Sequence, residues 1–214
     1  MIKPPFLKSS VQRNRKLKTE HQEYLENTKY LLENLDSLKN IKEYNKINLE
    51  IGFGKGEFLV KQALENQEEL FIGSELFLSG IAQVLEQSDK QNIHNIRIFN
   101  KDVRILLSEI KYALFDKIFI LFPDPWPKTR HNRRRIVNDY LFNEIFRILK
   151  TNGQVHIVTD SNDYAEQVFK LIEIDSRFKP LNQKDLLKVE DLNTSYHNKA
   201  KKQNNKINIF GIYK

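Results

Sequence analysis

The chain repeats one pattern of apolar and polar positions. A short apolar run leads through a turn into a stretch with apolar residues three and four apart, and this unit occurs at residues 47–67, 70–87, 95–110, 115–150 and 153–173. Five strands that alternate with helices predict a parallel sheet covered by helices on both faces. We therefore expect an α/β fold of the Rossmann-like class.

The two ends of this pattern differ from its middle. Residues 19–38 carry apolar side chains at spacings of three and four and predict an amphipathic helix. Residues 207–214 alternate with no helix after them, which predicts an antiparallel strand at the edge of a mostly parallel, seven-stranded sheet. A chain of 214 residues is long enough for one domain. We expect that domain over residues 19–214, after a flexible basic tail at residues 1–18.

The composition is that of a soluble globular protein, with 40% hydrophobic and 29% charged residues. No apolar run approaches the length that spans a bilayer, and the basic N-terminal stretch lacks the apolar core of a secretory signal. Cysteine is absent, which excludes disulfides and thiolate metal sites and fits a cytoplasmic location. We expect no membrane partner and no metal.

The positive charge is concentrated in three segments. Residues 1–18, 128–135 and 192–214 hold 16 of the 35 Lys and Arg residues and none of the 28 acids, in a chain with a net charge of +7. Clustered cations gain affinity for polyanions by releasing counterions from phosphates. The terminal segments could equally be solvated tails, whereas the internal one adjoins an unusual motif and favours nucleic-acid binding.

A glycine-rich turn follows the first strand in "LEIGFGKGEF". Gly52, Gly54 and Gly56 permit a tight turn and a close approach of the backbone to a ligand. Their spacing is G-x-G-x-G, and Glu57 stands where a dinucleotide fingerprint would have its third glycine. This disfavours a nicotinamide cofactor and favours S-adenosylmethionine, with a plain tight turn as the alternative.

Three acids near strand ends are candidate cofactor ligands. Glu75 ends the second strand and could accept both ribose hydroxyls, or could serve the start of the next helix. Asp102 follows the third strand and could bind the adenine amino group or cap a helix. Glu50 lies within the first strand, where burial without a partner is costly, so we expect it to face the pocket.

The loop after the fourth strand reads "FPDPWPKTRHNRRR". Its prolines limit backbone freedom and present Asp124 and Trp126 in a preset geometry, which suits methylation of a planar base. Alternatively, Trp126 anchors the core. The arginines that follow are placed to hold nucleic-acid phosphates, and they are Arg130, Arg133, Arg134 and Arg135.

The residues also bear on the type of methyl acceptor. Enzymes that methylate exocyclic amines carry Asp or Asn followed by two prolines and an aromatic residue, whereas this run is Pro-Asp-Pro-Trp. A ring nitrogen such as N7 of guanine loses no proton, so it needs alignment and a carboxylate that stabilises the developing cation. Asp124 fits that role. Exocyclic amine methylation and a non-catalytic RNA-binding protein remain as alternatives.

From about residue 46 to its C-terminus the chain closely resembles the bacterial tRNA (guanine-N7)-methyltransferase family. The resemblance rests on "LEIGFGKGEF", "GSEL", "NKDV", "FPDPWPKTRHNRRR", "VTDSNDYAE" and "TSYHNKAKKQ". It implies a class I methyltransferase fold and transfer of a methyl group from S-adenosylmethionine to the guanosine at position 46 in the tRNA variable loop. It also implies cofactor contacts at Glu50, Glu75, Asp102 and Asp124, catalysis by Asp124, and tRNA contacts at Lys128, Asp160, Thr194, Ser195, Tyr196 and His197. The oligomeric state, monomer or homodimer, stays open.

One position departs from that family, which usually has a glutamate where this chain has His197. A carboxylate accepts both donors on the Watson–Crick edge of guanine, whereas a neutral imidazole has one acceptor. Asp160, at the end of the fifth strand, could supply the missing acceptor or could cap the following helix.

Overall fold

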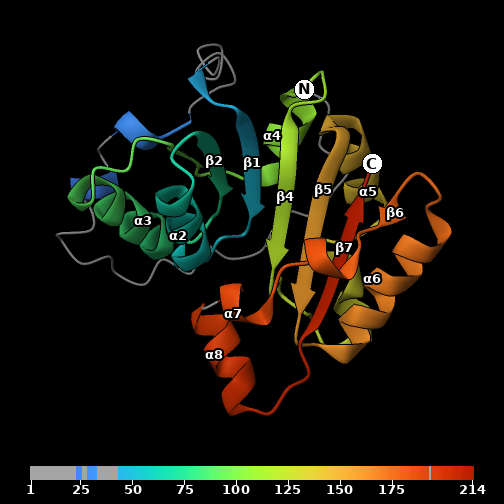
Figure 1. The fold of residues 1–214 in the computed structure, drawn as a ribbon. Helices are drawn as coiled ribbons and strands as arrows, with labels where there is room; N and C mark the ends of the chain where they lie inside the picture. Colours follow the sequence, from blue (N-terminus) through green and yellow to red (C-terminus); the bar gives the residue numbers. More distant parts are fainter. Residues whose placement is uncertain (1–22, 26–27, 33–42, 193) are drawn as a thin grey trace.

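The computed structural model describes residues 23–25, 28–32, 43–192 and 194–214. Its centre is a seven-stranded sheet in the order β3-β2-β1-β4-β5-β7-β6 (Figure 1). The strands are β1 (Lys46–Ile51), β2 (Glu69–Ser74), β3 (Ile96–Phe99), β4 (Phe115–Leu121), β5 (Leu149–Thr159), β6 (Lys179–Pro180) and β7 (Asn208–Tyr213). The first five are parallel, as expected.

The C-terminal strand is antiparallel, which confirms the expectation for residues 207–214. β7 pairs with β5 from Asn208, opposite Thr159, to Tyr213, opposite Gln154. The two-residue β6 then pairs antiparallel with the outer side of β7. β7 is therefore next to the edge of the sheet, and the short strand β6 forms the edge itself.

Helices cover both faces of the sheet (Figure 1). The bounds are α2 (Glu57–Glu65), α3 (Leu78–Lys90), α4 (Val103–Glu109), α5 (Asp139–Ile148), α6 (Asn162–Ile174), α7 (Val189–Leu192) and α8 (Ser195–Lys202). Buried side chains of α4, α5 and α6 belong to one apolar cluster, and those of α3 with most of α2 belong to a second. The strand–helix alternation thus becomes a sheet between two helical layers, as predicted.

Short polar side chains begin several of these helices. Asn138 accepts a hydrogen bond from the backbone N–H of Leu141 at the start of α5 (3.0 Å), and Ser161 accepts one from Tyr164 at the start of α6 (3.4 Å). Such caps satisfy N–H groups that have no partner within the helix. They fix where each helix leaves its strand, and therefore where the intervening loops lie.

The predicted continuous helix over residues 19–38 is present only in part: residues 23–25 are helical, but the chain departs from a helix from Thr28 onward. Thr28–Tyr30 forms a 3-10 turn, after which Leu31 makes a parallel bridge with Ile98 of β3. The N–H of Leu32 donates to the carbonyl of Ile98 (2.8 Å). Tyr30 and Leu32 are buried, so the apolar pattern does mark residues that pack inward, but they pack beside a sheet edge. The predicted tail at residues 1–18 lies outside the described residues.

The chain reverses its direction across the sheet between β1 and β4. From β1 it moves outward to β2 and β3, then returns to β4 on the other side of β1. In open α/β sheets, ligands bind beyond the carboxyl ends of strands at such a point. In Figure 1 these ends point downward, with α7 and α8 beside them. No helix among the described residues is long and apolar enough to cross a membrane.

Candidate active site

The glycine turn lies between β1 and α2, at the carboxyl end of β1. Gly52, Gly54 and Gly56 all have positive φ, at 74°, 58° and 74°, which side chains other than glycine rarely adopt. A Cβ at Gly56 would lie 2.0 Å from a methyl group of Val84, whereas one at Gly52 would meet nothing within 4 Å. The turn is therefore packed tightly against α3 on one side and leaves backbone open at Gly52.

Gly80 supports this turn, and the sequence reasoning missed it. A Cβ at Gly80, in the first turns of α3, would lie 1.8 Å from the carbonyl oxygen of Gly54. Only a glycine lets α3 approach the turn this closely. A glycine inside a helical pattern is the signal that could have indicated it, because glycine weakens a helix unless packing requires it.

The carboxylate of Glu75 organises the turn from the end of β2. Oε2 accepts from the N–H of Gly54 (2.8 Å), and Oε1 accepts from the N–H groups of Leu76 (2.6 Å) and Phe77 (3.0 Å). Glu75 thus fixes the glycine turn and the two residues that lead into α3, whereas α3 itself has no side-chain cap, so both predicted roles of Glu75 stay predictions. Each carboxylate oxygen has two lone pairs, so one site on Oε2 stays available for a ribose hydroxyl.

Glu50 is a buried carboxylate without a donor. Its side chain is 4% exposed, and no described residue hydrogen-bonds to its Oε2. Burial, with the nearby charges of Glu75 and Glu57, raises the pKa of Glu50 to about 8. An unpaired buried acid calls for a cationic or donating ligand. The sulfonium and amino groups of S-adenosylmethionine have the required charge, so the site fits that cofactor.

Asp102 caps α4. Its Oδ1 accepts from the N–H of Arg104 (3.0 Å) and from Nε of the same residue (2.8 Å), and its Oδ2 pairs with the Arg104 guanidinium. The cap was one of the two predicted roles of Asp102. A bond to the adenine amino group would have to share these oxygens with Arg104.

The loop after β4 presents Asp124 to solvent. Phe122 and Trp126, on either side of it, have positive φ of 49° and 44°, which is costly for aromatic residues and is typical of functional sites. Asp124 is exposed, and its carboxylate has no hydrogen bond or ion pair within the described part of the chain. Asp124 thus lies between two strained residues with its carboxylate free for a ligand, and its predicted role as a preset acceptor stays a prediction.

Trp126 is half-buried beside the basic segment and belongs to none of the three buried apolar clusters. The guanidinium of Arg134 lies 4.9 Å from its ring centroid, and the ring of His131 packs in a T-shaped arrangement with ring centroids 5.9 Å apart. The alternative that Trp126 anchors the core is thus not supported. A cation stacked on an aromatic ring stabilises both side chains, so Trp126 helps to hold the basic segment in place.

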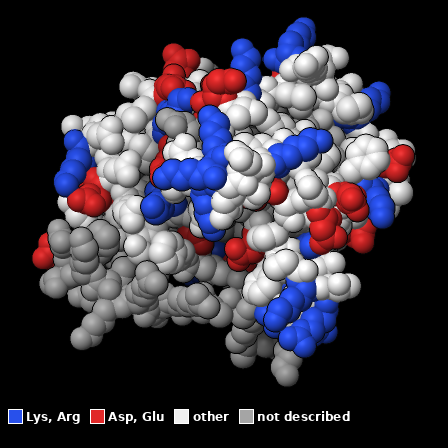
Figure 2. Space-filling view, turned by 90° about the horizontal axis from the view of Figure 1, so that it is seen from below, with Lys and Arg blue, Asp and Glu red and all other residues white. Residues whose placement is uncertain are grey.

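Three of the four predicted phosphate-binding arginines are exposed, as is Lys128. Lys128 precedes the 3-10 helix η4 (Thr129–Arg134), which carries Arg130, Arg133 and Arg134. The prediction that Arg135 binds phosphate is wrong. Arg135 is 2% exposed and donates to groups of the protein itself, so it is not available to a phosphate. Figure 2, which views the carboxyl edge of the sheet from below, shows both cations and acids on this face.

The start of α8 lies against the glycine turn. Glu57, the first residue of α2, accepts from both the N–H (2.8 Å) and the hydroxyl (3.0 Å) of Ser195, which is 138 positions further along the chain. The ring of Tyr196 lies over the turn, 3.1 Å from where a Gly54 Cβ would be. Burial, with the charges of Asp124, Glu75 and Glu57, raises the pKa of Tyr196. The structure thus brings Tyr196 together with Asp124 and the cofactor turn.

The other predicted substrate residues are placed differently. Thr194 caps α8 by accepting from the N–H of His197 (3.1 Å). His197 is 2% exposed, and its ring nitrogens have no partner among described residues. Burial, together with the charge of Lys201, lowers the pKa of His197. Asp160 accepts from the side chain of Asn205 (3.0 Å), and because Ser161 caps α6, the alternative that Asp160 is the cap is wrong.

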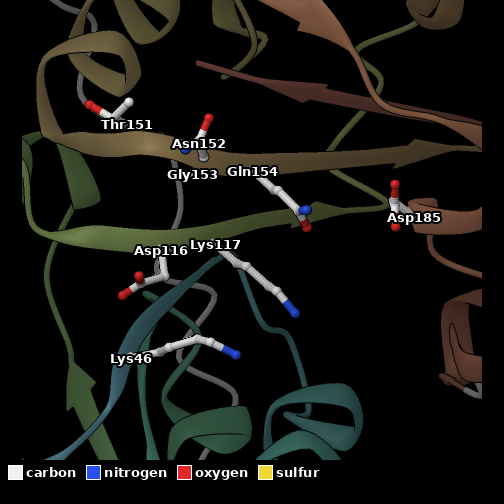
Figure 3. Close-up of a pocket in the computed structure, with 8 residues that line it drawn as sticks. All are labelled: Lys46, Asp116, Lys117, Thr151, Asn152, Gly153, Gln154 and Asp185. Carbon is white, nitrogen blue, oxygen red and sulfur yellow. The ribbon is translucent and has the colours of Figure 1, made fainter.

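A separate hollow lies at the opposite edge of the sheet (Figure 3). Its volume is about 530 Å³, and its lining is Lys46, Asp116, Lys117, Thr151, Asn152, Gly153, Gln154 and Asp185. Lys46 pairs with Glu69 (2.8 Å) and Asp116 with Lys150 (2.7 Å). The hollow lies at the amino ends of β1 and β4, far from the turn and from Asp124, so it is not part of this site.

A glycine turn, a buried acid and a preset acceptor at the point where the strand order reverses define a class I methyltransferase. Residues 44–209 match a family model described as "Putative methyltransferase". A tRNA (guanine-N(7)-)-methyltransferase of Wolbachia pipientis wMel is 37% identical over 95% of this chain and 90% of its own. The chain belongs to the tRNA (guanine-N(7)-)-methyltransferase family.

Further comparisons agree on the fold. A tRNA (guanine-N(7)-)-methyltransferase of Neorickettsia sennetsu is 42% identical over 63% of this chain. The chain spans only 61% of that relative and 32% of the bifunctional methyltransferase of Rickettsia felis. The solved structure of the 16S rRNA (adenine(1408)-N(1))-methyltransferase of Catenulisporales acidiphilia with cosubstrate SAM has a TM-score of 0.57 at 10% identity, and the match covers 84% of this chain and 90% of that one.

Proposed function

We propose that the protein transfers a methyl group from S-adenosylmethionine to N7 of a guanosine in tRNA, at position 46 of the variable loop, in the cytoplasm. The observation that carries the proposal is the unpaired carboxylate of Asp124, held in a proline-bracketed loop beside the glycine turn and Tyr196. The named relatives support tRNA and N7 as the acceptor. The names of these relatives give no position in tRNA, so the proposed position 46 rests on the family resemblance described above.

S-adenosylmethionine supplies an electrophilic methyl group when it is bound. The N7 lone pair would accept that methyl group while the sulfur of the donor kept the electron pair of the broken carbon–sulfur bond, which would leave the positive charge on the purine. No proton is lost, so no general base is needed. Asp124 stabilises the cationic purine, because a fixed carboxylate near developing positive charge lowers the barrier. Glu50 and the turn hold the donor, and the ring of Tyr196 lies over the turn at Gly54.

The exposed cations of the basic segment support tRNA as the partner. Lys128, Arg130, Arg133 and Arg134 extend from η4 and the residue before it, directly after the loop that carries Asp124. Cations in this place can hold the phosphates that flank a target nucleotide and fix its register. In this proposal they position the tRNA, whereas the base is selected at the carboxyl edge, near Asp160 and Tyr196.

A methyl-transfer assay tests the proposed function. Labelled S-adenosylmethionine is incubated with an unmodified tRNA transcript and with a matched transcript in which the guanosine at position 46 is replaced by adenosine, and the labelled nucleoside is then identified. We expect label in 7-methylguanosine from the first transcript only. Label in an exocyclic-amine product, or cofactor binding without any label in tRNA, would overturn the proposal.

The affinity for tRNA is expected to fall steeply with salt. If the four exposed cations near η4 each neutralise one phosphate, the slope of log K against log salt is about −3, which is a loss of about 60-fold between about 50 and 200 mM salt. Filter binding or fluorescence anisotropy over this range measures the slope. A slope near zero would contradict a phosphate-binding role for this segment.

A further inference from the structure

Arg135 is the last cation of the basic segment, and its surroundings differ from those of its neighbours. Its side chain is 1% exposed, whereas Arg133 and Arg134 are exposed. A charged side chain is rarely buried this fully unless its donors are all engaged. The contacts of the Arg135 guanidinium therefore indicate what the residue does.

Residues of α6 form a socket for this guanidinium. Nη1 of Arg135 donates to Oε1 of Gln167 (2.8 Å), and Nη2 forms an ion pair with Asp163. The guanidinium lies 4.8 Å from the ring centroid of Tyr164. The Tyr164 hydroxyl and the Gln167 side-chain amide bind the N–H and the carbonyl of Val137, both at 2.9 Å. The socket therefore holds Arg135 and also fixes the chain just after it.

The remaining donor reaches the loop of Asp124. Nε of Arg135 donates to the carbonyl of Pro125 (2.8 Å), the residue directly after Asp124. Pro123, Pro125 and Pro127 have no N–H groups, so this loop has few donors with which to fix itself. Positive φ at Phe122 and Trp126 also needs support from the surroundings. The Arg135 bond to Pro125 ties the strained loop to α6.

We propose that Arg135 is a positioning residue, which holds the loop that carries Asp124 and Trp126 in a fixed place relative to α6, and that it does not bind phosphate. The inference rests on the proposed function, because it concerns how Asp124 is held for methyl transfer. Lysine cannot replace Arg135, since one ammonium group cannot direct three donors in the plane of a fork while stacking on a ring.

The chain offers a direct probe of this loop, because Trp126 is its single tryptophan. Intrinsic fluorescence therefore reports on the loop with no substrate present. For Arg135→Lys we expect a red-shifted Trp126 emission, stronger quenching by acrylamide, and a kcat that falls by about tenfold or more, as misplacement of a catalytic group predicts. We expect the salt slope of tRNA binding to stay as in the parent protein.

Arg133→Ala is the matched control, two positions away in the same segment. It should leave the Trp126 emission unchanged and make the salt slope shallower by about one unit, as the loss of one phosphate contact does. If Arg135→Lys instead keeps the parental emission and makes the slope shallower, Arg135 is a phosphate contact and the proposal is overturned.

A milder variant guards against loss of folding in Arg135→Lys. Gln167→Met removes one acceptor of the guanidinium but leaves its bond to Pro125 possible, so we expect a smaller shift of emission in the same direction and an unchanged salt slope. Parental emission in both variants would refute the proposal. Failure of the parent protein to methylate tRNA would refute the proposed function alone, because the fluorescence comparison decides the role of Arg135 without activity.

Discussion

Replacing Asp124 with Asn is expected to lower kcat by about 100- to 1000-fold, the effect of removing one preorganised electrostatic contact to a transition state. Asparagine has nearly the same shape, so the loop between its prolines keeps its geometry, whereas the negative charge that stabilises the methylated purine is lost. The KM for tRNA should change by no more than about threefold, because Asp124 is expected to act only in the transition state. A contact that is equally strong in the bound substrate would raise KM and leave kcat unchanged. Single-turnover methyl transfer at saturating tRNA measures the difference.

Asp139→Asn is the control for this variant. Asp139 is exposed in the first turn of α5, close in sequence to the basic segment but outside the site. Removing its charge should leave kcat within about twofold of the parent, since surface substitutions away from special contacts have small effects. If Asp124→Asn weakens tRNA binding as much as it slows turnover, Asp124 has a mainly structural role and our mechanism is wrong.

Replacing Glu50 with Gln is expected to weaken S-adenosylmethionine binding by about tenfold or more at pH 8, as the loss of a buried ionic contact does. In the free parent protein the pKa of Glu50 is raised to about 8, so the carboxyl is mostly protonated at neutral pH. A cationic ligand favours the ionised form, so binding releases a proton. The parental affinity should therefore rise with pH by up to about tenfold per unit below pH 8 and level off above it.

Isothermal titration calorimetry in two buffers with different ionisation enthalpies measures that proton release. Glu50→Gln should abolish the proton release that comes from Glu50 and leave only the proton release of the ligand itself. The control Glu65→Gln, in the last turn of α2, should release as many protons as the parent does.

The free parent protein should also lose stability as pH rises from about 4.5 to about 8, because Glu50 loses its proton in the unfolded chain at a lower pH than in the folded protein. Affinity that is flat with pH would contradict the pairing of Glu50 with the ligand.

The fold could be predicted from the sequence because its signals are local. Each apolar strand is followed by its own helical pattern, and the positions of Gly52, Gly54 and Gly56 require backbone conformations that the structure contains. The same holds for Asp124, whose presentation depends on adjacent prolines. Where the residues that determine a local structure are neighbours in the chain, the sequence was enough to predict that structure.

The site residues that were missed or misassigned depend on distant contacts. Arg135 cannot be told from Arg133 and Arg134 in the sequence, because its burial is decided by α6, about thirty positions later. The bond from Ser195 to Glu57 joins positions 138 apart, and Glu57 was noted only for the glycine that it replaces. The helix prediction at Leu31 was wrong for a related reason. Leu31 does have helical spacing from its apolar neighbours, but its backbone pairs with the edge of β3 instead.

The position of β7 between β5 and β6 constrains the order in which the protein can be completed during synthesis. β6 leaves the ribosome before β7, yet its strand partner is β7. Until β7 arrives, one edge of β5 is open and can pair wrongly with another chain. α8, whose Tyr196 lies over the glycine turn, also emerges just ahead of β7. The edge of β5 is thus covered, and Tyr196 placed over the glycine turn, only after β1 to β5 have been made, so we expect no productive tRNA binding by a nascent chain before α8 and β7 emerge.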